Sequence, residues 1–155
     1  MNANTQGTTH YLNVDLDLYS EWNLQPLVTA MGKKVYVLYI GRHKRTYRAH
    51  LELASNSKSK SPDSTIRAFC AMIRTLPRVA RKEWDGAKVR DFNIGVQAAM
   101  QPYWYEIALA PETVKAASEV NARIVLTVYS PQVRREGTRD VKLGPKRSSR
   151  STLQR

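Results

Sequence analysis

The sequence predicts a single α+β domain with a mixed sheet of about six strands and its helices mainly on one face. Two observations lead to this class. Segments in which apolar and polar residues alternate are interspersed with segments whose apolar residues recur at helical spacing. In addition, residues 16–40 and 105–129 both show the order strand, helix, strand. This repetition predicts duplicated β-α-β units and a ferredoxin-like character.

The first third of the chain contains a half-buried strand, a short helix and a second strand. The strand spans residues 12–19, where leucine and valine alternate with polar residues. A helix over residues 23–31 follows, and Gly32 ends it. Residues 34–40 read KVYVLYI and are apolar at every position after the lysine, which is typical of a central strand covered on both faces.

The middle of the chain contains a hairpin strand and two helices. The turn Gly41–Arg45 leads into an alternating segment over residues 46–54, so we expect an antiparallel hairpin. Ser61 and Pro62 are favourable first residues for a helix, and its apolar positions recur at helical spacing. Pro77 ends this helix and opens a second one that runs to Gly86.

The last third is expected to add three strands and one helix. Residues 92–98 alternate as a fourth strand, and YWYEIALA over residues 103–110 is interpreted as a fifth. A helix begins after Pro111, and RIVLTVY over residues 123–129 is a sixth strand that is apolar on both faces. A parallel crossover buries its second strand beside its first, which is the pattern expected of both units.

The domain boundaries follow from composition. Residues 11–131 are predicted to form the domain, with a flexible loop at residues 55–61, where the sequence is rich in serine and lysine. Residues 1–10 and 132–155 contain too few apolar residues to offset the entropy of ordering, so we expect them to be disordered. Half of the net charge of +12 lies in the C-terminal tail, which carries eight Lys or Arg and two acidic residues.

The lengths of the apolar runs and the number of cysteines limit where the protein can be located and which cofactors it can hold. No apolar run approaches the roughly 20 residues of a membrane span. A single cysteine excludes an intramolecular disulfide and a multi-cysteine zinc site. We therefore expect a cytoplasmic protein with no membrane association, no metal and no cofactor.

The chain resembles a group of small uncharacterised bacterial α+β domains with duplicated β-α-β units. The resemblance rests on DLDLYS in the first strand and on the closing unit ALAPETVKAASEVNARIVLTVY, and it covers roughly residues 11–130. Some of these domains are similar to the immunity proteins of bacterial toxin systems. The resemblance implies a compact, non-enzymatic binding module, and it carries over no functional residue.

Polar residues at the outward positions of the strands form the main candidate site. If the strands share a sheet, these side chains lie together on its open face, where they favour recognition of a protein partner or self-association of a strand edge. Exposed aromatic residues anchor interfaces, so Trp104 joins this set, although a peripheral core position is an alternative. The candidate partner-binding residues are Asp15, Asp17, Arg48, His50, Glu52, Asn93, Gln97 and Trp104, with Glu106 on the same open face.

Two other functions remain open. Non-specific nucleic-acid binding by the tail and the Gly41–Arg45 turn is the first alternative, because clustered cations attract phosphate. Its candidate residues are Arg42, Lys44, Arg45, Arg134, Arg135, Lys146 and Arg147. An enzyme is the second alternative, with carboxylates and a histidine as acid and base, and its candidate residues are Asp15, Asp17, His50 and Glu52.

RNA binding on the open sheet face is disfavoured. RNA-recognition domains place aromatic residues on that face, whereas Tyr47 falls on the apolar side and the outward positions include carboxylates that repel phosphate. Cys70 lies on the apolar stripe of a helix, where a thiol is inert.

Overall fold

The computed structural model describes residues 7–54 and 61–131, which form a five-stranded sheet and four α-helices. The sequence predictions for residues 1–6, 55–60 and 132–155 lie outside the described residues. The elements in chain order are β1 (His10–Ser20), α1 (Gln25–Met31), the 3-10 turn η1 (Gly32–Lys34), β2 (Val35–His43), β3 (Thr46–Leu53), α2 (Pro62–Arg74), α3 (Arg78–Gly86), β4 (Val89–Gln97), α4 (Pro111–Glu119) and β5 (Arg123–Tyr129).

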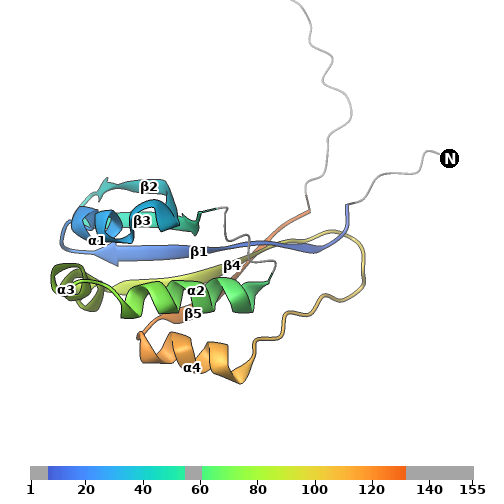
Figure 1. Cartoon of the computed structure of the whole chain (residues 1–155). Coiled ribbons are helices and arrows are strands. Elements are labelled where there is room, and N and C mark those ends of the chain that lie inside the picture. The colour runs from blue at the N-terminus through green and yellow to red at the C-terminus, as the bar shows by residue number, and fades with distance from the viewer. Residues whose placement is uncertain (1–6, 55–60, 132–155) are drawn as a thin grey trace, which may run out of the picture.

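The sheet has the strand order β2-β3-β1-β4-β5. β1 is the central strand and runs antiparallel to both β3 and β4, while β2 is antiparallel to β3. β4 and β5 are parallel, and α4 provides the crossover between them. The described chain begins and ends at the same end of the sheet (Figure 1). The mixed sheet and the α+β class are as predicted from the sequence.

One face of the sheet and all four helices form a single hydrophobic core. Alternate residues of β1, from Val14 to Leu18, are almost fully buried and belong to the same cluster as the apolar side chains of α1, α2, α3 and α4. α1 packs beside α3, and α2 packs beside α4 (Figure 1). Phe69 of α2 stacks on Phe92 of β4 with ring centroids 5.9 Å apart. Burying one such side chain contributes roughly 1.5–3 kcal/mol.

Local sequence signals explain where α2 begins. The Ser61 hydroxyl accepts a hydrogen bond from the Ser64 N–H at 3.3 Å, and Pro62 occupies the first helical position. Asp63 in the first turn accepts a hydrogen bond from the Ala110 N–H at 2.9 Å. That bond joins the start of α2 to the residue that precedes α4, so it fixes the end of the long connection after β4.

The prediction of a strand over residues 103–110 is wrong, and the sheet has five strands rather than six. In that segment Ile107 and Leu109 pack on the core while Glu106 and Ala108 are exposed. The alternation that suggested a strand is therefore real, but the segment runs outside the sheet. The position beside β4 is occupied by β5, which pairs with it in parallel along its whole length. The ferredoxin-like assignment stays a prediction.

Residues 34–40 were expected to form a central strand, but β2 is one edge of the sheet, and β5, the other strand that is apolar on both faces, is the opposite edge. β3 lies between β1 and β2, so the first β-α-β unit does not place its two strands side by side. β5 is parallel to β4 rather than to a strand at residues 103–110. Neither β2 nor β5 is buried on both faces, because several of their large apolar side chains are exposed.

The predicted hairpin at Gly41–Arg45 is confirmed by the antiparallel pairing of β2 and β3. Lys44, with a φ of 55°, adopts the left-handed conformation within its tight turn. None of the described helices is long and apolar enough to cross a membrane.

Candidate functional site

The face of the sheet that points away from the core is polar. Residues of β1 on this face alternate with its buried leucines, and their partners across the strands have the same orientation. We call this surface the polar face. It comprises Asn13, Asp15, Asp17, Tyr19, Arg48, His50, Glu52, Asp91, Asn93, Gln97, Arg123 and Thr127.

Asp17 is the centre of a hydrogen-bond chain that crosses four strands. Its Oδ1 lies 2.7 Å from Nδ1 of His50 on β3, and its Oδ2 accepts a hydrogen bond from Nδ2 of Asn93 on β4 at 3.0 Å. The Thr127 hydroxyl on β5 donates to Oδ1 of Asn93 at 2.7 Å. Because a carboxylate only accepts, Nδ1 of His50 carries the proton in this arrangement. Three predicted site residues are thus brought into direct contact.

A pair of carboxyl groups lies next to this chain. Nδ2 of Asn13 donates both to Oδ1 of Asp15, at 2.9 Å, and to Oε1 of Glu52. Burial, together with the nearby negative charges of Glu52 and Asp17, raises the pKa of Asp15 to about 6. Asp15 therefore holds its proton to a higher pH than an ordinary aspartic acid.

Aromatic rings surround the histidine. The ring of Tyr19 meets His50 edge-on with centroids 6.1 Å apart, and the ring of Tyr39 lies at 5.8 Å. The guanidinium of Arg48 lies 4.7 Å from the centroid of the Tyr19 ring, a cation–π contact. These contacts fix the side chains of β1, β2 and β3 relative to one another.

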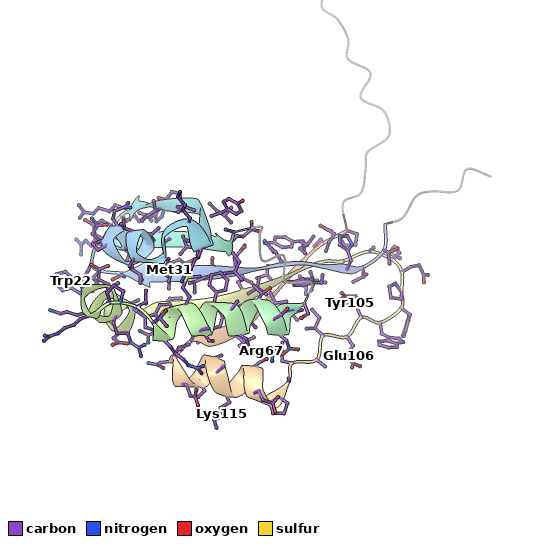
Figure 2. All side chains as sticks on the ribbon, viewed as in Figure 1. Trp22, Met31, Arg67, Tyr105, Glu106 and Lys115 are labelled. Carbon is purple, nitrogen blue, oxygen red and sulfur yellow. The ribbon has the colours of Figure 1, made fainter. Side chains whose placement is uncertain are left out.

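Gln97, Trp104 and Glu106 lie away from this network. Gln97 is at the far end of β4, where its Nε2 donates to the Ser130 carbonyl at 3.0 Å. Trp104 is 70% exposed on the connection after β4, so it is not the peripheral core residue that one interpretation of the sequence suggested. Glu106 is on the same connection, at the opposite end of the molecule from Trp22 (Figure 2). The polar face therefore contains only part of the predicted set.

Sequence reasoning missed three members of this region. Asn13 occupies an outward position of the first strand, and its alternation with Leu12 and Val14 was a usable signal. Thr127 is the one polar residue of β5 between Arg123 and Tyr129, but describing that strand as apolar on both faces hid its role. Tyr39 was hidden for the same reason.

The sequence also gave no indication of the exposed apolar edge along β2. Four consecutive large residues there have exposed fractions between 43 and 55%. They lie on both faces of the strand, because Tyr36 pairs with Glu52 of the polar face while Val37 pairs with the buried Leu51. We call this surface the β2 edge, and it consists of Tyr36, Val37, Leu38 and Tyr39.

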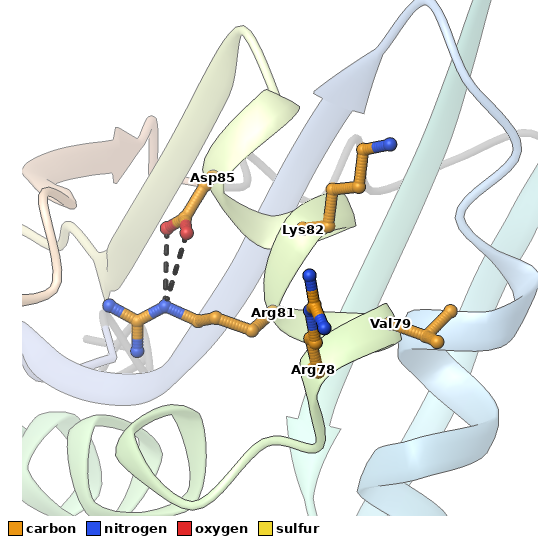
Figure 3. A pocket seen from close by; sticks show the side chains of 5 residues that line it. All are labelled: Arg78, Val79, Arg81, Lys82 and Asp85. Atoms are coloured by element: carbon orange, nitrogen blue, oxygen red, sulfur yellow. Dashed lines mark hydrogen bonds and ion pairs between the residues drawn. The ribbon is translucent and has the colours of Figure 1, made fainter.

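Two surface hollows are lined mainly by cations. One lies on α3, where Arg81 forms an ion pair with Asp85 at 3.2 Å beside Arg78 and Lys82 (Figure 3). The other lies at the hairpin turn and is lined by His43, Lys44, Arg45, Thr46 and Arg48. Arg42 is beside it, with its guanidinium 5.9 Å from the Tyr47 ring centroid. The predicted tail residues Arg134, Arg135, Lys146 and Arg147 lie outside the described residues.

Chemically, the polar face can hold the His50 ring in one orientation and keep a proton on the Asp15 carboxyl group. Across residues 7–54 and 61–131, no three His, Cys, Asp or Glu side chains are grouped to hold a metal ion. Cys70 is buried in the core, and burial raises the pKa of its thiol to about 11. No family model, curated protein or solved structure matches this chain.

Proposed function

We propose that this protein is a non-enzymatic binding module whose partner is another protein. The β2 edge is the observation that carries this proposal. An unpaired edge strand normally avoids exposed apolar residues, since it presents free backbone groups and invites association. Here four large apolar side chains in a row are about half exposed at such an edge. A protein partner would remove them from water.

The chemistry of the polar face supports binding over catalysis. Asp17 is occupied by two donors, His50 and Asn93, and the next member of the chain is the hydroxyl of Thr127. This is a satisfied cross-strand network, and such networks make a sheet rigid. The polar face then acts as a firm support for the β2 edge, whose residue Tyr39 contacts the His50 ring.

The finer predictions remain part of the same proposal. The order of the first four strands, β2-β3-β1-β4, with helices on one face fits a ferredoxin-like unit extended by β5. The resemblance to immunity proteins is compatible with a compact binder of this kind. A single buried cysteine fits a reducing, cytoplasmic location.

Site-specific photo-crosslinking tests the proposal. A photoreactive amino acid is placed at Tyr39 in the full-length chain expressed in its native host, and the matched control places it at Lys115, which is exposed on α4 (Figure 2). We expect nuclease-resistant protein adducts from position 39 and few from position 115. Equal adducts from both positions, or none from position 39, would contradict the proposal.

Nucleic-acid binding is a second candidate, and one observation favours it. The hollow at the hairpin turn is lined by the exposed Lys44 and Arg45, and neither forms an ion pair with the carboxylates of the described chain. Unpaired cations remain available for phosphate, and such binding weakens steeply with salt.

Titration of labelled single- and double-stranded oligonucleotides at two salt concentrations separates this candidate. Two full-length variants are compared with the wild type, one with Arg42, Lys44 and Arg45 changed to serine and one with Arg134, Arg135, Lys146 and Arg147 changed to glutamine. Salt-sensitive binding that falls about tenfold or more in either variant supports this function. Absence of binding at low salt eliminates it.

A further inference from the structure

We infer that the β2 edge binds an extended segment of a partner protein as an added strand, and that this segment has an apolar centre flanked by acidic residues. The inference rests on the proposed function and specifies the chemistry of its partner. Main-chain hydrogen bonds provide affinity in this mode of recognition, and alternate side chains provide selectivity. Three features of β2 support it.

The first feature is the direction of the backbone groups. The N–H of Ala54 donates to the carbonyl of Lys34 at 2.9 Å, so Lys34 and Ala54 form a hydrogen-bonded pair. Such pairs alternate with non-hydrogen-bonded pairs along an antiparallel ladder. Val35 and Val37, opposite Leu53 and Leu51, therefore direct their N–H and carbonyl groups away from β3. The N–H of Val35 already donates to the carbonyl of Gly32. The carbonyl of Val35 and both the N–H and the carbonyl of Val37 are therefore the groups that an added strand would meet.

The second feature is the charge at the two ends of the strand. Lys33 and Lys34 precede it, and Arg42 and Lys44 lie at its other end; all four side chains are exposed. Within the described chain none of these cations makes an ion pair. The β2 edge is thus an apolar stretch with positive charge at both ends, and an acidic-flanked segment is its electrostatic complement.

The third feature is the irregularity at Leu38. Val37 pairs with Leu51 and Tyr39 pairs with His50, so Leu38 is an extra residue in β2. Lys34 and Arg42 are eight positions apart, one of which is this extra residue. On a regular partner strand the matching acidic residues would be seven positions apart. This spacing defines the probe.

A second copy of the chain is a poor occupant of the same edge. Two β2 strands related by a twofold axis pair antiparallel, and pairing centred on Leu38 sets Lys34 of one copy opposite Arg42 of the other. Like charges directly opposite each other destabilise a sheet.

Fluorescence anisotropy with the full-length protein tests the inference. The probe is a labelled ten-residue peptide with two glutamates at each end and six alternating valine and threonine residues between them. Its control has lysines in place of the glutamates. We expect the acidic-flanked peptide to bind at least tenfold more tightly, with a difference that shrinks as salt is added. Equal binding of the two peptides overturns the inference.

Backbone methylation of the peptide tests the strand geometry. Two versions of the acidic peptide are made. One carries N-methyl groups on the odd-numbered central residues, and the other carries them on the even-numbered central residues. In an added strand only every second backbone N–H of the peptide donates to β2. One methylated version should therefore lose at least tenfold in affinity, and the other should keep its affinity. Equal loss in both versions, or in neither, contradicts strand addition.

Variants of the protein complete the test. Lys33→Glu with Lys34→Glu should weaken the acidic peptide at least tenfold and strengthen the lysine peptide. Val37→Thr should weaken both peptides, whereas Val114→Thr, at a similarly exposed valine of α4, should change neither. Sedimentation velocity that finds a dimer lost in Val37→Thr would assign the edge to a second copy and overturn the inference.

The two proposals fail separately. If position 39 gives protein adducts but no acidic peptide binds, the protein is a binding module with a different kind of partner. If position 39 gives no adducts, the proposed function fails whatever the peptides do.

Discussion

Nδ1 of His50 lies 2.7 Å from Oδ1 of Asp17, which joins the central strand to β3 on the polar face. The side chain of Asp17 is only 15% exposed and also accepts from Asn93 on the other side, at 3.0 Å. One carboxylate therefore ties together three neighbouring strands. Removing it should have a measurable effect on the stability of the whole sheet.

Asp17→Ala should lower the free energy of unfolding by about 2 kcal/mol, because it leaves the donors of His50 and Asn93 without their acceptor. Asp17→Asn should cost about 1 kcal/mol less than Asp17→Ala. Its amide oxygen still accepts from Asn93, and its amide nitrogen can donate to the other tautomer of His50. Urea unfolding at pH 7 checks both values. Equal losses in the two variants would show that the bonds contribute little.

Asp15→Asn should stabilise the protein at neutral pH. The pKa of Asp15 is raised to about 6 by burial and by Glu52 and Asp17, so ionising the group is unfavourable in the folded state. The protonated Asp15 side chain makes its full contribution to the free energy of unfolding below about pH 4, and this contribution is lost as the pH rises through 6. Because the group is partly exposed, we expect a gain of only about 1 kcal/mol at pH 7.5.

The gain from Asp15→Asn should disappear at pH 4, where the wild-type carboxyl is already protonated. Urea unfolding of both proteins at pH 4, 5.5 and 7.5 measures this dependence. Glu106→Gln is the control, since Glu106 is exposed and forms no ion pair with the described residues. A gain for Asp15→Asn that does not change with pH would refute the assigned cause.

Trp84→Phe should lower the free energy of unfolding by about 2 kcal/mol. Trp84 is fully buried, and its Nε1–H donates to the Val120 carbonyl at 2.9 Å. The variant loses core volume and leaves that carbonyl without its partner. It should also lose the blue-shifted part of the fluorescence, because Trp22 and Trp104 are 68% and 70% exposed. Trp104→Phe is the control, and it should change neither the blue-shifted fluorescence nor the free energy of unfolding.

Cys70 should be unreactive in the native protein. Burial raises the pKa of its thiol to about 11 from 9.0, which alone lowers the thiolate fraction at pH 8 by about 100-fold. Reaction with a disulfide reagent should therefore be at least 100-fold slower in buffer than in 8 M urea, and full reactivity should return with unfolding. Rapid modification of the native protein would show that the α2 core is open to solvent.

Much of the local structure could be predicted because it depends on short-range sequence patterns. The alternation around Leu16 fixes which side of β1 is buried, and the outward positions of Asp17 and His50 follow from the same period of two. The cap at Ser61 fixed the start of α2, and the Gly41–Arg45 turn fixed the β2–β3 hairpin. These features need no knowledge of distant residues.

Strand neighbours could not be predicted in the same way. An apolar run such as that of β2 has the same appearance in a buried central strand as at an exposed edge, because hydrophobicity does not specify what lies on either side. The segment around Ile107 alternates as a strand does, yet it packs on the core without a ladder partner. Pairing is decided between segments far apart in the chain.

The sequence by itself determined the α+β class, the helices, the hairpin and the division of β1 into an apolar and a polar side. Only the tertiary structure decided that β1 is central and that β2 and β5 are the edges. It also decided that Thr127, Asn93, Asp17 and His50 form one chain across four strands. The physical reason is that periodicity is a property of one segment, whereas strand order is set by long-range hydrogen bonding and by competition for the space beside each strand.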